Sequence, residues 1–318
     1  RFGTFFPARG LESWSERNLI PEPELFHPDL VVFKRRAHSL QQMVQAFASG
    51  VSAHEAVRNS EQLLNPALRL ARYRSYRDER SRDLVRKQLR VADPGQVVPD
   101  LAHTRFDPQT ARDPGYDELR VVGVAPMPHF DPRMAPYPGP DPARFQAYLE
   151  KLASFVKWLL TERQCTVVFF VGEIHQDEPV VDDVLRILER QGVDVNSPRV
   201  KRPKIRTVAE LGECLADMQI VVASRFHSVL LPLALARPVV ALTYHPKVTE
   251  LMRDMGQTEY CLDIDAFQIG DLISGFESLW SKREATRNHL LATSTEYRSR
   301  IQNQYNLAFP AAKEGRAA

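Results

Sequence analysis

Short apolar runs alternate with stretches of helical periodicity in the second half of the chain. The apolar runs have the length and β-branched content of buried strands, and they are Val121 to Ala125, Thr166 to Val171, Ile220 to Ala223 and Val239 to Leu242. Between the first two runs, apolar residues recur at helical spacing from Phe145 to Leu159. The alternation predicts an α/β fold in which helices cover both faces of a parallel sheet.

Further helices follow from the same periodicity. One is predicted around Val181 to Leu188, and another begins at Thr207, which forms a capping box with Glu210. A mostly helical tail is predicted from about Asp271 to Leu307.

The stretch from Gln219 to Lys247 predicts one strand–helix–strand unit with cationic side chains at its strand ends. Arg225 and His227 follow the first strand, and Tyr244, His245 and Lys247 follow the second. The carboxyl ends of parallel strands meet at one edge, where open α/β sheets bind ligands beside helix N-termini. We therefore predict a pocket for a small, strongly anionic ligand. Taken singly, each of these residues fits a structural or solvated role better, but their convergence favours the pocket.

Two other predicted strands also end in polar groups. His129 lies in the long proline-rich loop 126–142, and His175 and Asp177 follow the strand at 166–171. Loops of this length inside compact domains are usually functional or disordered.

The first half of the chain has weaker patterns. A brief strand is predicted at 30–33, followed by the basic turn KRRAH, and helices follow from Leu40. Ser75 and Tyr76 close a short strand, after which Arg77 is a further candidate for the wall of a cleft. We expect domains at 1–115 and 116–318, joined by a proline-containing linker at 103–118.

The composition limits which classes of function the chain can have. The 318 residues carry a net charge of +2, with 43% hydrophobic and 26% charged residues, as in an ordinary globular protein. Near-neutrality gives no reason to expect a nucleic-acid partner, and the basic stretch from Arg69 to Arg90 is interleaved with acidic residues. The chain starts with Arg1 rather than methionine, so we expect that an N-terminal piece is missing.

Cysteine and histidine spacing argues against a metal site. The three cysteines, Cys165, Cys214 and Cys261, are too scattered for a metal box or a disulfide framework, and the histidines are dispersed. A reducing cytoplasm fits this usage best. No stretch approaches the roughly 20 apolar residues of a spanning helix, and peripheral association with a membrane surface stays open.

Several of these segments together resemble the polysaccharide pyruvyl transferase family. The matching segments are RYRSYRDERSRDL and VVPDLA in the first half, VVGVAPMPHF at the start of the second, and ADMQIVVASRFHSVLLPLALARPVVALTYHPK near its centre. The resemblance implies two Rossmann-like domains facing a cleft, as in glycosyltransferase B folds. It also implies phosphoenolpyruvate as donor and co-substrate, no other cofactor, and a glycan or lipid-linked saccharide as acceptor.

The resemblance places Arg225, His227 and Lys247 at the donor. Phosphoenolpyruvate carries a carboxylate and a phosphate, so its site needs several fixed cations. Ketal formation also needs an acid and a base that work near neutral pH. His227 is the first candidate for the acid, and His129 and Asp177 are candidates for its catalytic partners. The remaining donor-site candidates are His245, Arg77 and His175.

The beginning of the chain departs from the family pattern. Family members place glycines after their first strand, where this chain has Lys34, Arg35 and Arg36. The N-terminal, acceptor-side domain is therefore expected to be truncated or replaced. A nucleotide-sugar glycosyltransferase or epimerase stays open as an alternative, because a basic strand edge would also hold a diphosphate. A non-catalytic sugar- or anion-binding module stays open as well.

Overall fold

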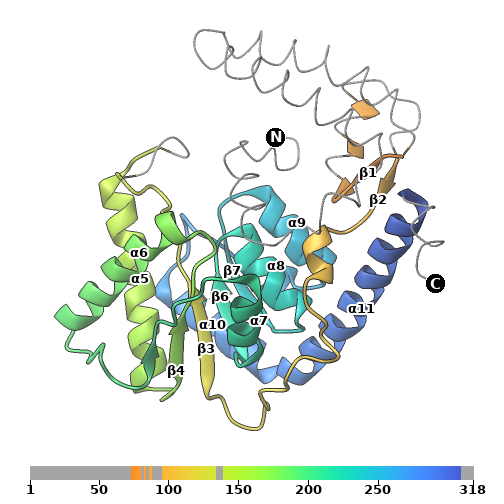
Figure 1. Cartoon of the computed structure of the whole chain (residues 1–318). Helices are drawn as coiled ribbons and strands as arrows, with labels where there is room; N and C mark the ends of the chain where they lie inside the picture. The colour runs from red at the N-terminus through yellow and green to blue at the C-terminus, as the bar shows by residue number, and fades with distance from the viewer. Residues whose placement is uncertain (1–72, 80–81, 84–85, 88–94, 134–138, 309–318) are drawn as a thin grey trace, which may run out of the picture. The chain divides into compact units, whose positions relative to one another are not determined.

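The computed structural model of the chain describes residues 73–79, 82–83, 86–87, 95–133 and 139–308 (Figure 1). The chain divides into two compact units, Arg1–Val98 and Pro99–Ala318, and each is described by itself. The strand predicted at 30–33, the KRRAH turn and the helices predicted from Leu40 lie outside the described residues. A Rossmann-like N-terminal domain therefore stays a prediction.

The described part of the first unit contains a pair of parallel strands. β1 (Ser75–Tyr76) pairs with β2 (Gln96–Val97), and the amide of Val98 donates to the carbonyl of Tyr76 at 2.8 Å. Parallel neighbours need a crossover connection, and the described residues 82–83 and 86–87 between these strands are helical. The short strand predicted at Ser75 and Tyr76 is confirmed.

A parallel sheet forms the centre of the second unit. Its strands are β3 (Val121–Ala125), β4 (Thr166–Phe169), β5 (Val200–Lys201), β6 (Ile220–Ala223), β7 (Val239–Thr243) and β8 (Cys261–Asp263). They lie in the order β5-β4-β3-β6-β7-β8, and all neighbours are parallel. Counted from β3, this is the 3-2-1-4-5-6 order of Rossmann folds. The order reverses between β3 and β6, which makes that point the topological switch.

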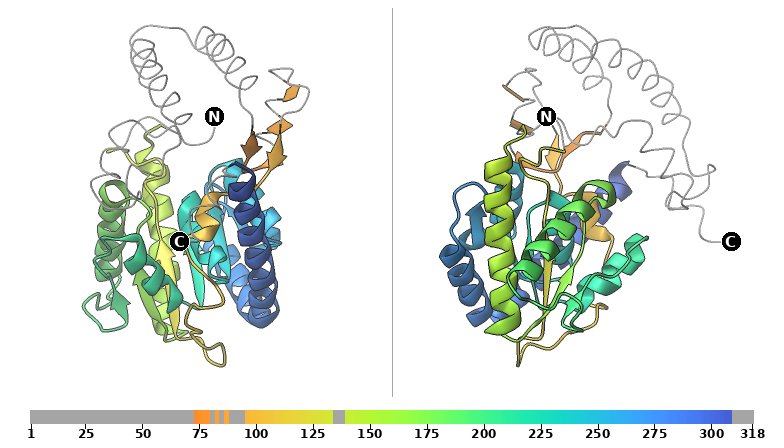
Figure 2. Two further views of the ribbon diagram at one scale, coloured as in Figure 1. Left: turned by 45° about the vertical axis from the view of Figure 1, so that its right-hand side comes forward. Right: turned by 90° about the vertical axis from the view of Figure 1, so that its left-hand side faces the viewer.

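Two layers of helices cover the sheet (Figure 2). The helices are α5 (Pro142–Thr161), α6 (Ile174–Arg190), α7 (Val208–Ala216), α8 (Phe226–Ala234), α9 (Pro246–Asp254), α10 (Ile269–Ser281) and α11 (Arg283–Ala308). α5 packs against α6 and α10, whereas α8 packs against α7, α9 and α11. The predicted α/β fold with a parallel sheet is confirmed. A cleft between two Rossmann-like domains stays a prediction.

Local sequence explains where these elements begin and why they are buried. All residues of β6 are buried, as expected for a central parallel strand built from a continuous apolar run. α5 begins after Asp141, whose carboxylate accepts from the amide of Arg144 at 3.0 Å, with Pro142 in the first turn. The predicted capping box of Thr207 and Glu210 is confirmed at the start of α7.

The segment expected to link two domains lies in the second unit. Short 3-10 helices are η2 (Leu101–Thr104) and η3 (Thr258–Tyr260), and η2 packs against α8 and α11. The ring of Phe106 lies so close to Gly212 that a Cβ added there would be 2.4 Å from a ring carbon. Residues 99–118 thus form part of the C-terminal unit. None of the described helices is both long and apolar enough to cross a membrane.

Candidate functional site

Arg225 is held by the buried carboxylate of Asp177. Its Nε donates to both Asp177 oxygens at 2.6 and 2.8 Å, and its Nη2 donates to Gln176 Oε1 at 2.8 Å. Asp177 has 0% of its side chain exposed, whereas Arg225 has 23%. Among the described residues, no hydrogen-bond partner of Nη1 is found. The guanidinium is therefore fixed along one edge and partly open to solvent.

The Asp177 carboxylate is anchored from its other side by the turn after β4. Its Oδ2 accepts from the amides of Gly172 and Glu173 at 3.1 and 2.9 Å. Burial raises the pKa of Asp177 to about 6, although Arg225 and these amides act in the opposite direction. Asp177 has no exposed surface, and both of its oxygens accept hydrogen bonds, so it can hold the guanidinium of Arg225 in one orientation.

Gly172 permits the close approach of α8 to this turn. A Cβ at this position would lie 2.4 Å from Ser228 Oγ and 3.3 Å from Arg225 Cδ. Real Cβ atoms essentially never show contacts under 3 Å, so a side chain here would require the Ser228 side chain or α8 to shift. The glycine after β4 thus helps to set the position of Arg225.

Lys247 lies in the first turn of α9, which the sequence analysis did not predict. Pro246 starts the helix, and Nδ1 of His245 caps it by accepting from the amide of Lys247 at 3.2 Å. Lys247 thus follows β7 at the carboxyl edge of the sheet, as predicted, and Pro246 explains why a helix starts there. Its Nζ lies 5.3 Å from the centre of the Tyr244 ring and 5.9 Å from that of Phe226.

His227 is partly buried in the first turn of α8, immediately after Phe226, the ring that Lys247 approaches. Arg225, His227 and Lys247 thus come from the starts of two helices that pack against each other. His175 is exposed in the first turn of α6, two residues from Asp177. Arg77 belongs to the first unit, where its Nε donates to Asp78 at 3.3 Å.

His129 is buried at the carboxyl end of β3 and is paired with a residue that the sequence analysis missed. Its Nε2 lies 2.9 Å from Oδ1 of Asp265, two residues beyond β8. Burial lowers the pKa of His129, against the raising effect of Asp265. Asp265 also pairs with Arg144 at 3.3 Å. No local periodicity indicates a role for Asp265. The only local signal was the acidic DIDA segment that follows Leu262.

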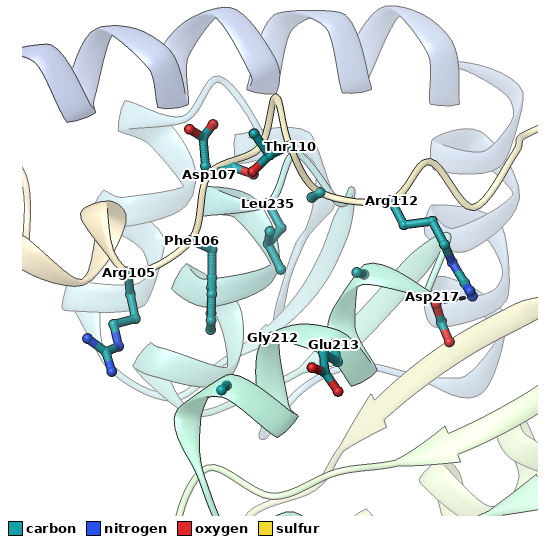
Figure 3. Close-up of a pocket in the computed structure, with 12 residues that line it drawn as sticks. Arg105, Phe106, Asp107, Thr110, Arg112, Gly212, Glu213, Asp217 and Leu235 are labelled. Atoms are coloured by element: carbon teal, nitrogen blue, oxygen red, sulfur yellow. Dashed lines mark hydrogen bonds and ion pairs between the residues drawn. The ribbon is translucent and has the colours of Figure 1, made fainter. Parts of the chain in front are cut away.

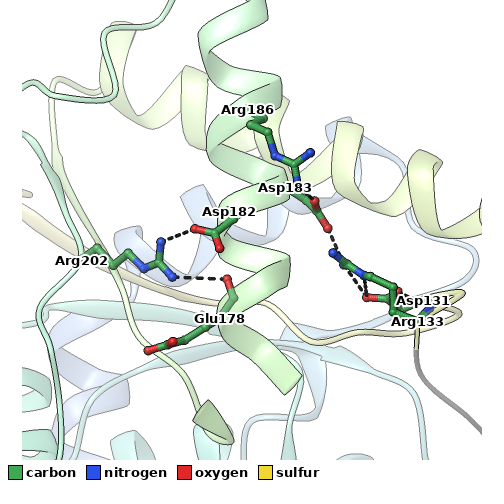
Figure 4. Close-up of polar contacts among 7 residues, drawn as sticks. All are labelled: Asp131, Arg133, Glu178, Asp182, Asp183, Arg186 and Arg202. Carbon is green, nitrogen blue, oxygen red and sulfur yellow. Dashed lines mark hydrogen bonds and ion pairs between the residues drawn. The ribbon is translucent and has the colours of Figure 1, made fainter. Parts of the chain in front are cut away.

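An ion-pair network fixes the loop after β3 to the outer face of α6 (Figure 4). Arg133 forms a bidentate pair with the fully buried carboxylate of Asp131 and reaches Asp183 at 2.5 Å. On the same helix, Asp182 pairs with Arg202, which directly follows β5. The network shows how acidic residues of α6 hold two neighbouring loops at the carboxyl edge.

A separate hollow of about 710 Å³ lies between residues 105–112 and α7 (Figure 3). Phe106 and Leu235 form its apolar part, and Arg112 and Asp217 make an ion pair at its rim. It contains none of the predicted site residues. Within the described ranges, no group of three or more His, Cys, Asp or Glu side chains could hold a metal ion.

The fold and these strand ends define a Rossmann-ordered α/β protein with arginine, lysine and histidine gathered at the carboxyl edge of its sheet. The sequence matches the polysaccharide pyruvyl transferase family over residues 33–246, more than half of the chain. The chain belongs to that family, as the resemblance predicted. No curated protein matches it.

Solved structures that match the chain are distant in sequence. A chain in the structure of accessory secretory proteins 1, 2 and 3 of Streptococcus pneumoniae shares 12% identity, covering 80% of this chain and 46% of that one, with a TM-score of 0.47. The UDP-GlcNAc 2-epimerase of Neisseria meningitidis shares 10%, covering 74% and 61%, with a TM-score of 0.41. A wall teichoic acid polymerase shares 10%, covering 85% and 64%, with a TM-score of 0.41. This chain spans about half to two thirds of their lengths, and TM-scores below 0.5 assign neither fold nor function.

Proposed function

We propose that this chain transfers the pyruvyl group of phosphoenolpyruvate to a sugar of a polysaccharide or its precursor, forming a pyruvate ketal. Membership of the polysaccharide pyruvyl transferase family supports the reaction class. The observation that carries the proposal is the oriented guanidinium of Arg225 at the start of α8, next to the helix that presents Lys247. A planar guanidinium and an ammonium are the partners that a carboxylate and a phosphate need.

Within this proposal, Arg225 and Lys247 bind the donor and His227 delivers the proton. Lys247 is placed over two aromatic rings, Tyr244 and Phe226, which limit its freedom. His227 is the candidate acid for the enol carbon, because it lies two residues from Arg225 and ordinary histidine titrates near neutral pH. Asp177 is assigned to positioning Arg225, in place of the direct catalytic role predicted from the sequence.

The other donor-site predictions have smaller roles in this proposal. His245 caps α9 and so holds Lys247 in place. His175 at the start of α6 and Arg77 of the first unit stay predictions for donor binding. The acceptor is a glycan or a lipid-linked saccharide, at a membrane surface in the second case. Phosphoenolpyruvate is a metabolite of the cytoplasm, which is the proposed location, and the reaction needs no other cofactor.

The test is incubation with phosphoenolpyruvate and a panel of glycans, with phosphate release and product mass as readouts. A product heavier than the acceptor by one pyruvate minus water, with one phosphate released per ketal, is expected. Arg225→Ala and Lys247→Ala should each raise KM for phosphoenolpyruvate about ten- to a hundredfold, because a hydrogen bond to a charged group is lost. Arg253→Ala, an exposed change on α9, is the matched control.

A nucleotide-sugar glycosyltransferase or epimerase is the competing proposal. The 3-2-1-4-5-6 strand order and two cations at helix starts would also suit a diphosphate. Protection from thermal unfolding by a nucleotide diphosphate sugar, with none by phosphoenolpyruvate, would favour it. Binding of phosphoenolpyruvate without ketal formation on any glycan would favour the non-catalytic module.

A further inference from the structure

His129 and Asp265 meet because their two loops lead into neighbouring helices. His129 follows β3 and Asp265 follows β8, and β6 and β7 lie between these strands. The loop after β3 continues into α5, the loop after β8 continues into α10, and α5 packs against α10. Lys151 of α5 reinforces the contact by donating to the carbonyl of Phe267 at 2.7 Å. The 2.9 Å bond between Nε2 and Oδ1 therefore rests on two anchored loops.

This bond decides which nitrogen of His129 carries the proton. An ionised carboxylate only accepts hydrogen bonds, so Nε2 of a neutral imidazole must be the donor to Asp265. Nδ1 is then a lone-pair acceptor. It is buried and has no hydrogen-bond partner among the described residues. A buried acceptor left unpaired carries a free-energy cost that a donating hydroxyl would relieve.

His129 is separated from the proposed donor groups by one aromatic ring. Its ring centre lies 6.2 Å from that of Tyr244, and the Tyr244 ring centre lies 5.3 Å from Nζ of Lys247. The next residue, Phe130, has a φ of 63°, a conformation that costs free energy for a bulky residue and is concentrated at functional sites. The Tyr244 ring thus connects Lys247 of the proposed donor site to the histidine whose Nδ1 is a buried acceptor.

We propose that His129 is the general base that takes the proton from the acceptor sugar's hydroxyl, and that Asp265 is its positioning residue. The inference rests on the proposed pyruvyl transfer. The side chain of His129 is 4% exposed, and the Phe130 ring centre lies 4.2 Å from its own. Because Nδ1 is buried, the side chains that cover it must move before an acceptor hydroxyl can reach it.

The proton balance of the reaction requires such a base. The first sugar oxygen bonds to C2 of phosphoenolpyruvate while an acid protonates C3, and Nδ1 takes the hydroxyl proton. Cleavage of the C2–O bond then releases phosphate with the bonding pair, and the second hydroxyl adds to C2. Nδ1 first returns its proton to the acid that protonated C3, and it then passes the proton of the second hydroxyl to the departing phosphate. Two hydroxyl protons thus end on the new methyl group and on phosphate, without an oxidant or reductant.

The charged groups that face His129 give the expected pH dependence. They are Asp265 and Asp263 after β8, and Arg144 of α5. Burial lowers the pKa of His129 from 6.5, so the base is neutral at pH 7. In the pH profile, the decrease of kcat on the acid side should therefore lie below pH 6.5. Asp265 raises that pKa, so Asp265→Asn should move the acid limb to still lower pH.

Kinetics on two variants test the inference. His129→Gln keeps a donor for Asp265 but removes the base, and it should lower kcat about a hundredfold or more with KM for phosphoenolpyruvate nearly unchanged. Asp265→Asn should lower kcat about tenfold or more, because an amide also stabilises the wrong tautomer. His289→Gln, an exposed change on α11, is the matched control. Isothermal titration should give wild-type affinity for phosphoenolpyruvate in both test variants.

A second readout does not depend on turnover. Long-range ¹H–¹⁵N spectra of the wild-type chain should show His129 neutral at pH 7, with Nε2 protonated and Nδ1 bare. A protonated Nδ1, or a kcat of His129→Gln within about threefold of wild type, would overturn the inference while leaving pyruvyl transfer intact. Absence of phosphate release by the wild-type chain with every glycan would instead overturn the proposed function.

Discussion

Arg225 and Asp177, 48 residues apart in sequence, form an ion pair in which the acid is buried and the arginine is partly exposed. The carboxylate is fixed by two backbone amides, so it acts as an anchor for the guanidinium. Nε of Arg225 already donates to Asp177, so this edge of the guanidinium is not available to a ligand. Because the Asp177 carboxylate offsets the charge of Arg225, the proposed donor binding also requires the charge of Lys247.

Asp177→Asn tests the anchoring. The amide keeps the size of the side chain but weakens the bonds to Arg225 and repels one amide donor. We expect KM for phosphoenolpyruvate to rise about tenfold, in keeping with the loss of a charge-assisted hydrogen bond. Initial rates against donor concentration measure it. Asp182→Asn removes an exposed ion pair on the same helix and should change KM by less than about twofold. Equal KM values for the two variants would contradict the anchoring role.

The pH dependence of stability gives a separate test of the same carboxyl group. Its folded pKa of about 6 lies above the ordinary value of 3.8, so the folded chain binds this proton more tightly than the unfolded chain. The resulting stabilisation is present below about pH 4 and is lost as pH rises through about 6. Urea unfolding of the wild type and Asp177→Asn should show the wild type losing about 3 kcal/mol relative to the variant over this range. A relative gain with rising pH would mean that the ion pair outweighs burial.

Gly172→Ala should disturb both stability and donor binding. The added Cβ would overlap Ser228 Oγ and crowd the Arg225 side chain, so the Ser228 side chain or α8 must shift. We expect a loss of about 1–3 kcal/mol in the free energy of unfolding, as for overpacked cores, and a higher KM for the donor. Gly275→Ala in α10 is the control, since nothing lies within 4 Å of its Cβ position. That change should stabilise the chain by about 0.5–1 kcal/mol, because alanine favours helices. Destabilisation by both would count against the crowding argument.

Arg237 joins separate segments of the second unit through a buried side chain that is 2% exposed. Its guanidinium donates to the carbonyls of Ala216, at 3.0 Å, and Arg112, and to the hydroxyl of Tyr116 at 3.4 Å. Arg237→Met would leave two carbonyls without this donor, so we expect a loss of about 2–4 kcal/mol in urea unfolding. Arg120→Met, whose side chain is 73% exposed, should cost less than about 1 kcal/mol. Similar losses in both would refute a special role for Arg237.

The sequence alone determined the elements whose signals are local. β3 and β6 occupy the ranges predicted from their apolar runs, and the capping box at Thr207 starts α7 as expected. Apolar periodicity and caps act within a few residues, so they can be seen without the rest of the chain. Cationic residues at the strand ends after β6 and β7 were visible for the same reason. α9 was not predicted, although Pro246 marks its start, because the apolar run before it indicates only the strand.

Tertiary structure alone decided how those residues pair. The sheet order brought the turn after β4 to Arg225, and the packing of α5 on α10 brought Asp265 to His129, 136 residues away in sequence. These pairings show Asp177 bound to Arg225 and Nε2 of His129 bound to Asp265, whereas a direct catalytic role for Asp177 stays a prediction. No periodicity of the chain encodes them, because they depend on which loops the packed helices bring together.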